Sequence, residues 1–140
     1  MKNDIIKNME NKIDKLGWIY IENKKLLAVR SYGKEAFYVP GGKRETGETD
    51  EEALIREARE ELCIDIIPGS LNFVGKFEAL AHGKINTVVQ ITAYTADFDG
   101  EIRPNAEIEE ISWLAYKDIE KATPVMKLIL QYLKDNFLID

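Results

Sequence analysis

The chain has 140 residues, of which 45% are hydrophobic and 31% charged, a balance typical of one globular domain rather than of a disordered segment. Its 25 acidic and 19 basic residues give a net charge of −6, which argues against broad electrostatic binding to nucleic acid or anionic membrane. A single cysteine excludes an internal disulfide and a multi-thiolate zinc site. No apolar run approaches the about 20 residues of a membrane span, and residues 1–4 begin no signal-peptide pattern, so the expected location is the cytoplasm.

An N-terminal helical extension is predicted over residues 1–16. Apolar side chains recur there at spacings typical of a helix face, at Ile5, Ile6, Met9, Ile13 and Leu16. Gly17 then provides a natural helix stop. Such a helix serves either as a docking arm or as part of the core, and the pattern does not separate the two.

The remaining residues, 17–140, are expected to form one domain of mixed strands and helices. Runs rich in β-prone residues predict strands at 18–21, 26–29, 37–39, 71–81, 87–96 and 108–115. Helical periodicity predicts helices at 49–62 and 124–137, the first with a capping box made by Thr49 and Glu52. The strands at 18–21 and 26–29 are expected to pair as a hairpin. This alternation of elements indicates a mixed sheet with helices packed on it.

The helix at 49–62 contains the strongest chemical signal. Eight acidic residues lie between positions 45 and 61, and Glu57, Glu60 and Glu61 share one helix face because they sit at i, i+3 and i+4. Like charges so close repel one another, and a divalent cation such as Mg²⁺ or Mn²⁺ would relieve that repulsion with hard oxygen ligands. The alternative is a solvated acidic helix face, which is the usual role of a charge run.

The spacing around this helix resembles the Nudix box, which reads G-x5-E-x7-R-E-U-x-E-E-x-G-U with U a bulky aliphatic residue. Six fixed identities of the box are present, at Gly42, Glu48, Arg56, Glu57, Glu60 and Glu61. Two positions depart from it. Ala58 is smaller than the usual aliphatic residue, and Cys63 replaces the glycine that would end the helix in a left-handed conformation. We expect the cysteine to cost some stability and to leave the chemistry intact; a reactive thiol is the alternative.

The resemblance implies an enzyme that uses Mg²⁺ or Mn²⁺ to cleave a phosphoanhydride in a nucleoside diphosphate linked to another moiety, or in a nucleoside triphosphate. It assigns the metal to Glu57 and Glu61 with the carbonyl of Gly41, and it gives Glu60 a place in the metal cluster or the role of general base. Arg56 would orient the carboxylates through ion pairs with Glu48 and Glu57. Gly42 and Glu48 would be structural.

Two further residues outside the box are candidates for the site. In relatives, a glutamate before the late strand acts as base or ligand, and Glu107 would take that role here, although Glu109 and Glu110 crowd the same segment and a surface charge is the alternative. Arg30 follows a predicted buried strand and would meet a substrate phosphate, unless it forms an ordinary surface ion pair.

The predicted fold class is α/β, a Nudix-type α/β/α sandwich around a mixed sheet, plus the N-terminal helix. The expected partner is a small nucleotide or another diphosphate-containing substrate, without broad nucleic-acid or membrane binding. A homodimer formed through the N-terminal helix or a sheet edge is left open. Two other functions are also open: a nucleotide-binding sensor without turnover, and an interaction domain whose N-terminal helix docks a partner. The intact Glu57, Glu60 and Glu61 argue against the sensor.

Overall fold

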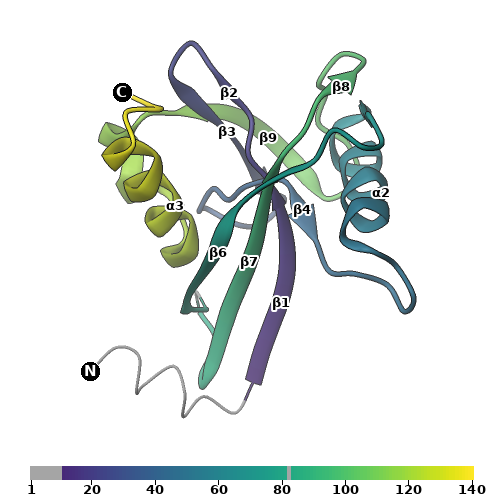
Figure 1. Cartoon of the computed structure of the whole chain (residues 1–140). Helices are drawn as coiled ribbons and strands as arrows, with labels where there is room; N and C mark the ends of the chain where they lie inside the picture. The colour runs from purple at the N-terminus through teal and green to yellow at the C-terminus, as the bar shows by residue number, and fades with distance from the viewer. Residues whose placement is uncertain (1–10, 82) are drawn as a thin grey trace.

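The computed structural model describes residues 11–81 and 83–140. Its strands are β1 (Asn11–Trp18), β2 (Ile21–Glu22), β3 (Lys25–Ser31), β4 (Gly41–Gly42), β5 (Asp65–Ile66), β6 (Asn72–Leu80), β7 (Thr87–Thr95), β8 (Phe98–Asp99) and β9 (Ile108–Leu114). The helices are α2 (Asp50–Leu62), the 3₁₀-helix η1 (Tyr116–Lys121) and α3 (Pro124–Asp135). The long strands stand between α3 on one side and α2 on the other (Figure 1), which confirms the predicted α/β layers.

A four-stranded mixed sheet with the order β4-β1-β7-β6 forms the centre of the fold. Strands β1 and β7 run parallel in a register from Asn11 opposite Thr87 to Trp18 opposite Tyr94. Strand β6 is antiparallel to β7, and the short strand β4 is antiparallel to β1. A second sheet has the order β2-β3-β9, and β5 pairs with β8. The predicted hairpin is present in shortened form, because β2 pairs with β3 through Ile21 and Glu22. The predicted strand at 18–21 is otherwise wrong, since Trp18 is the last residue of β1.

The predicted N-terminal helix is wrong over residues 11–16, which belong to strand β1. Residues 1–10 of that prediction lie outside the described residues. Strand β1 has partners on both sides, with β7 parallel along its whole length and β4 at its end. Backbone pairing with strands from distant parts of the sequence therefore overrides the local spacing of Ile13 and Leu16.

Two hydrophobic clusters fill the spaces between the sheets and the helices. One contains Met126, Ile129, Leu130 and Leu133 from α3, packed with residues from the sheets such as Ile91. The other contains Ala53, Leu54, Ala58 and Leu62 from α2, packed with residues such as Trp18. Both helices therefore have one buried face, as their sequence periodicity predicts.

Helix α2 begins where the sequence predicts. Thr49 caps it, and the side chains of Thr49 and Glu52 each accept a hydrogen bond from the other's backbone amide. The predicted strand at 37–39 is reduced to two isolated bridges, in which Tyr38 pairs with Val29 and Phe37 with Ala122. No helix in the described part of the chain has both the length and the apolar character needed to cross a bilayer.

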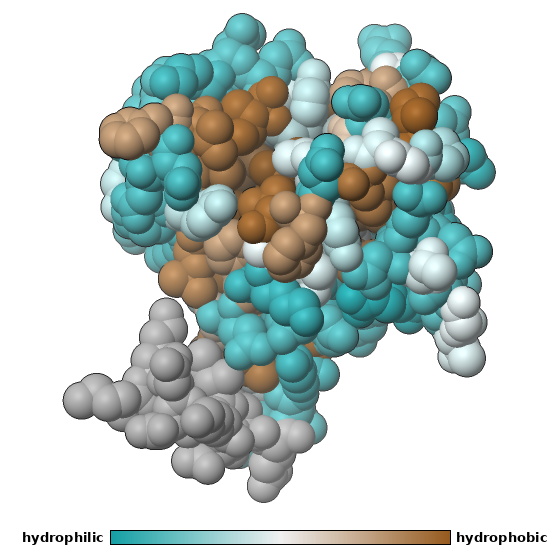
Figure 2. Space-filling view, viewed as in Figure 1, coloured by the Kyte–Doolittle hydropathy of each residue, from teal (hydrophilic) through white to brown (hydrophobic). Residues whose placement is uncertain are grey.

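The surface combines a polar rim with local apolar areas. In Figure 2 hydrophilic side chains cover most of the outline, and apolar side chains gather between α3 and the upper part of the sheet. Exposed Phe73 on β6 and Tyr132 on α3 contribute large apolar side chains to the surface.

Candidate active site

Two glycines allow strand β4 to pack closely against strand β1 and helix α2 at the candidate site. Gly41 has a φ of +145°, and a Cβ atom there would lie 2.1 Å from the carbonyl oxygen of Leu16. A Cβ atom on Gly42 would lie 2.6 Å from the carboxylate of Glu57. A side chain at Gly41 would push the strand away from β1, and one at Gly42 would displace the Glu57 carboxylate, so this arrangement requires glycine at both positions.

Three carboxylates converge beside this glycine corner. One oxygen from each of Glu57, Glu61 and Glu107 lies within 4.8 Å of the others. Glu61 is only 2% exposed, and its Oε1 accepts a hydrogen bond of 2.9 Å from the amide of Gly41. Burial and a hydrogen bond with Glu107 raise the pKa of Glu61 to about 9, and burial also raises the pKa of Glu57. Such a crowded, partly dehydrated set of oxygens fits a hard divalent cation.

Arg56 braces the cluster from the side of α2. Its guanidinium donates to both carboxylate oxygens of Glu48 at 2.8 Å, to Glu57 at 2.9 Å and to the carbonyl of Lys43 at 3.0 Å. These contacts raise the pKa of Arg56 and lower the pKa of Glu48 to about 2. Both ion pairs that the box implied for Arg56 are therefore present, and Glu48 fixes the arginine rather than reaching the cluster.

The segment before β9 carries Glu107 into the cluster. The amide of Arg103 donates to the carbonyl of Leu62, and the amide of Asn105 donates to the carbonyl of Glu61, each at 2.9 Å. The Asn105 side chain also donates to the carbonyl of Glu60 at 2.9 Å. These bonds satisfy carbonyls left free at the end of α2 and fix the loop to the helix. Sequence reasoning missed Asn105, because a polar residue near a turn does not by itself indicate a contact with a helix end.

Glu60 and Arg30 lie apart from the three-carboxylate cluster. The Glu60 side chain is 53% exposed, and its carboxylate lies 3.5 Å from the Arg56 guanidinium. Arg30 pairs with Glu109 at 2.7 Å and with Glu110 at 2.9 Å, which is the surface ion pair considered as the alternative. The structure thus separates Glu107 from its two neighbouring glutamates. Roles for Glu60 in the chemistry and for Arg30 in substrate binding stay predictions.

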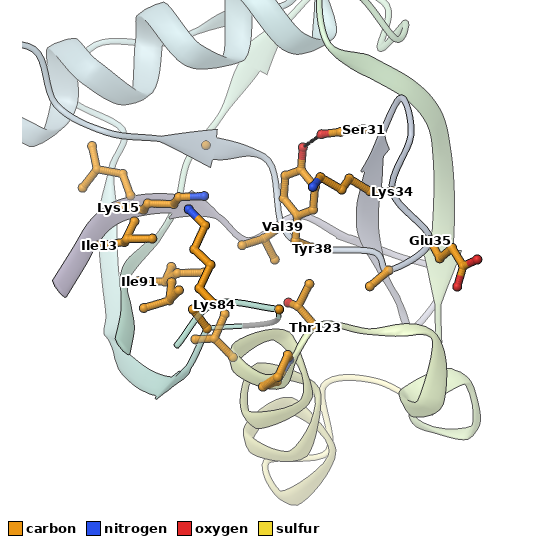
Figure 3. A pocket seen from close by; sticks show the side chains of 18 of the residues that line it. Ile13, Lys15, Ser31, Lys34, Glu35, Tyr38, Val39, Lys84, Ile91 and Thr123 are labelled. Atoms are coloured by element: carbon orange, nitrogen blue, oxygen red, sulfur yellow. Dashed lines mark hydrogen bonds between the residues drawn. The ribbon is translucent and has the colours of Figure 1, made fainter. Parts of the chain in front are cut away.

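Two cavities adjoin one another at the site, and the smaller one contains the carboxylate cluster. The smaller, about 400 Å³, is lined by Glu57, Glu61 and Glu107, and the larger, about 640 Å³, extends away from them toward α3. Residues that line both cavities join them, namely Lys15, Ser31, Tyr38 and Gly41. Figure 3 shows the larger cavity, where the Tyr38 ring lies between Ser31 and Val39.

Several residues of these cavities were missed by sequence reasoning. Tyr38 is hydrogen-bonded to Ser31, and burial raises the pKa of its phenol to about 12, so it is neutral at physiological pH. Lys15 and Lys84 also line the larger cavity. They come from segments far apart in the sequence, and no local pattern connects them.

Comparisons with known proteins agree with this fold and identify the family. The family model for the NUDIX domain matches residues 16–133. An ADP-ribose pyrophosphatase from Methanocaldococcus jannaschii is 30% identical over 121 residues, which cover 84% of this chain and 70% of the relative. The chain therefore belongs to the Nudix family of MutT-like hydrolases.

Solved structures share the fold at lower identity. A MutT NUDIX hydrolase from Burkholderia pseudomallei superposes with a TM-score of 0.71 at 22% identity, covering 87% of this chain and 98% of that one. A bifunctional NMN adenylyltransferase/ADP ribose pyrophosphatase from Francisella tularensis, solved with AMP and a Mn ion, superposes with a TM-score of 0.64 at 18% identity. That match covers 96% of this chain and 47% of the larger protein. At these identities the likeness shows the fold.

Proposed function

We propose that this Nudix hydrolase is a divalent-metal-dependent pyrophosphohydrolase that cleaves a phosphoanhydride in a small nucleotide. The observation that carries the proposal is the gathering of Glu57, Glu61 and Glu107 in the smaller cavity, which adjoins the larger one. A diphosphate is itself strongly anionic, so three carboxylates at its binding site favour it only when a cation lies between them. Glu57, Glu61 and Glu107, with the Gly41 carbonyl, would hold Mg²⁺ or Mn²⁺.

When bound, the cation supplies positive charge to the diphosphate and activation to a water molecule. The chain's own residues position these groups. Arg56 keeps the Glu57 carboxylate in place, and the amide of Gly41 does the same for Glu61. Glu107 and Glu60 are the two carboxylates proposed to take a proton from the attacking water; Glu107 lies inside the cluster and Glu60 at its exposed side. The larger cavity would hold the nucleoside part of the substrate.

The substrate class follows from the size of the cavity and from the archaeal relative. A cavity of about 640 Å³ is within the usual size of a small-molecule site. The relative at 30% identity is an ADP-ribose pyrophosphatase, so ADP-ribose is the first compound to test. We expect a nucleoside diphosphate linked to another moiety to be a better substrate than a nucleoside triphosphate. The cytoplasm remains the predicted location.

A substrate panel tests the proposal directly. ADP-ribose, a nucleotide sugar, a dinucleoside polyphosphate and a nucleoside triphosphate are each incubated with Mg²⁺ or Mn²⁺, and the products are identified by chromatography. Glu57→Gln and Glu61→Gln should lower turnover by about 100-fold or more. Glu120→Gln, whose side chain is 87% exposed on η1, serves as the control and should retain full turnover.

Two results would contradict the proposal. The first is full metal-dependent hydrolysis by both cluster variants, which would remove the assigned ligands. The second is binding of these compounds without turnover, which would favour the nucleotide-binding sensor. Comparing Glu60→Gln with Glu107→Gln then tests the base: loss of turnover with retained metal affinity identifies the base, whereas loss of both turnover and metal affinity identifies a metal ligand.

A further inference from the structure

Two lysines approach one another inside the larger cavity. Lys15 lies on the central strand β1, and Lys84 lies in the connection between β6 and β7. Figure 3 shows their ammonium groups pointing to the same region, with Ile13, Val39 and Ile91 nearby. Both side chains line the larger cavity, and Lys15 also lines the smaller one. Lys15 therefore lies where the larger cavity adjoins the carboxylate-lined one, and Lys84 reaches the same region from the larger cavity.

Neither Lys15 nor Lys84 forms an ion pair with another residue in the described part of the chain. Within residues 11–81 and 83–140, the lysines that form ion pairs are Lys12, Lys121 and Lys127. Burial lowers the pKa of Lys15, and the positive charges of Lys43 and Lys84 lower it further, against the attraction of Glu61. Like charges held together in a partly apolar cavity cost free energy, and a bound anion removes that cost.

We propose that Lys15 and Lys84 together bind the phosphate group that lies on the pocket side of the carboxylate cluster. The inference rests on the proposed function and adds the residues that hold the second half of the diphosphate. The carboxylates would hold the cation that neutralises one phosphate, and the two ammonium groups would donate to oxygens of the other. Since Lys15 lines both cavities, its ammonium group can reach a phosphate that bridges them.

The position of the pair also orients the substrate. A diphosphate held at one end by the cation and at the other by the lysines has its nucleoside side directed into the larger cavity. Val39 and Ile91 line that cavity with aliphatic surface, which suits the uncharged part of a nucleotide. Through Lys84, the loop between β6 and β7 takes part in substrate binding.

The test measures binding of methylenediphosphonate, a diphosphate analogue that the enzyme cannot hydrolyse, by calorimetry at saturating Mg²⁺. Lys15→Met and Lys84→Met should each weaken binding by about tenfold or more, because a charge-assisted hydrogen bond is lost. Lys15→Arg and Lys84→Arg keep the charge and should retain most of the affinity. Lys12→Met is the matched control, since Lys12 lies on the same strand and pairs with Glu78 at 3.5 Å.

Steady-state kinetics with the best substrate of the panel gives a second measurement. The methionine variants should raise KM in parallel with the loss of analogue affinity, while Lys12→Met leaves KM unchanged. If both methionine variants bind the analogue within twofold of wild type, the inference is wrong even if the enzyme is active. If the analogue depends on the lysines but no compound is hydrolysed, the inference holds and the proposed function fails.

Discussion

The amide of Gly41 donates a hydrogen bond of 2.9 Å to Oε1 of Glu61, and this bond joins strand β4 to helix α2 at the centre of the site. Glu61 is nearly inaccessible to solvent, so its carboxyl group needs partners inside the protein. The neighbouring Gly42 lies so close to the carboxylate of Glu57, the second carboxylate from α2, that a Cβ atom there would clash with it. The strand thus positions Glu61 through a backbone amide and leaves space beside Gly42 for the carboxylate of Glu57, which Arg56 holds.

The first prediction concerns Gly42→Ala. The new Cβ atom would lie 2.6 Å from the Glu57 carboxylate, so that side chain must move out of the cluster. We expect kcat/KM to fall by about 100-fold, as expected for a catalytic group displaced by about 1 Å. Gly75→Ala is the control, since its Cβ atom would have only ordinary contacts at 3.5 Å. Equal activity of the two variants would contradict the assigned role of Gly42.

The second prediction concerns Arg56→Lys. A lysine keeps the positive charge, but its compact ammonium group lacks the planar fork with which the guanidinium donates to both oxygens of Glu48 and also to Glu57. We expect kcat/KM to fall by about 100-fold while the protein stays folded by circular dichroism. Arg59→Lys changes an exposed pair with Asp65 and should have little effect. Retained activity in Arg56→Lys would show that charge alone suffices.

The third prediction concerns the pH dependence of stability without metal. Burial raises the pKa of Glu61 from its ordinary 4.5 to about 9, so the folded protein keeps a proton that the unfolded chain has released. Between these two values the free energy of unfolding therefore falls as the pH rises. Glu61→Gln cannot ionise, so its free energy of unfolding should fall less over the same range.

Urea unfolding in EDTA at several pH values between about 5 and 9 measures this difference. Glu60→Gln provides the control, because the Glu60 side chain is largely exposed, and it should follow the wild type. Adding Mg²⁺ at high pH should restore more stability to the wild type than to Glu61→Gln, since metal binding favours the ionised carboxylate. Parallel pH profiles for wild type and Glu61→Gln would contradict the prediction.

The fourth prediction concerns Cys63→Gly. Cys63 ends helix α2 with φ 60° and ψ 30°, the left-handed conformation in which glycine is the preferred residue. Glycine should raise the free energy of unfolding by about 0.5–1 kcal/mol, after allowing for its greater freedom in the unfolded chain. Cys63→Ala keeps the unfavourable conformation and should remain close to wild type. Full activity in Cys63→Ala would also argue against a reactive thiol.

The fold was predictable where local patterns agree with the long-range contacts. Helix α2 shows a capping box and an apolar face in its sequence, and the structure confirms both. Strand β1 shows the opposite case. Residues 11–16 are polar at many positions and carry apolar residues at helical spacing, yet they become a strand because β7 pairs with them along their full length. Nothing within the segment indicates that partner.

The residues of the site also divide into those that the sequence pattern identifies and those that only the fold brings together. The spacing of the box identified Glu57 and Glu61, and the structure places them together, whereas Glu107 had two equally acidic neighbours in the sequence. The docking of the Asn105 segment onto the end of α2 and the pairing of Arg30 with Glu109 and Glu110 distinguish Glu107 from them. The meeting of Lys15 and Lys84 likewise depends on the parallel sheet and on the β6–β7 connection, which bring distant residues to one cavity.

The parallel pairing of β1 and β7 constrains the order in which the parts of this protein can fold during synthesis. Every residue from 19 to 86 is synthesised between these two strands, so β1 must wait for its main neighbour until most of the chain has left the ribosome. Closing so long a loop is slow compared with forming a helix or a hairpin. Helix α2 can form early, but the pocket is completed only when β7 has paired with β1, late in translation.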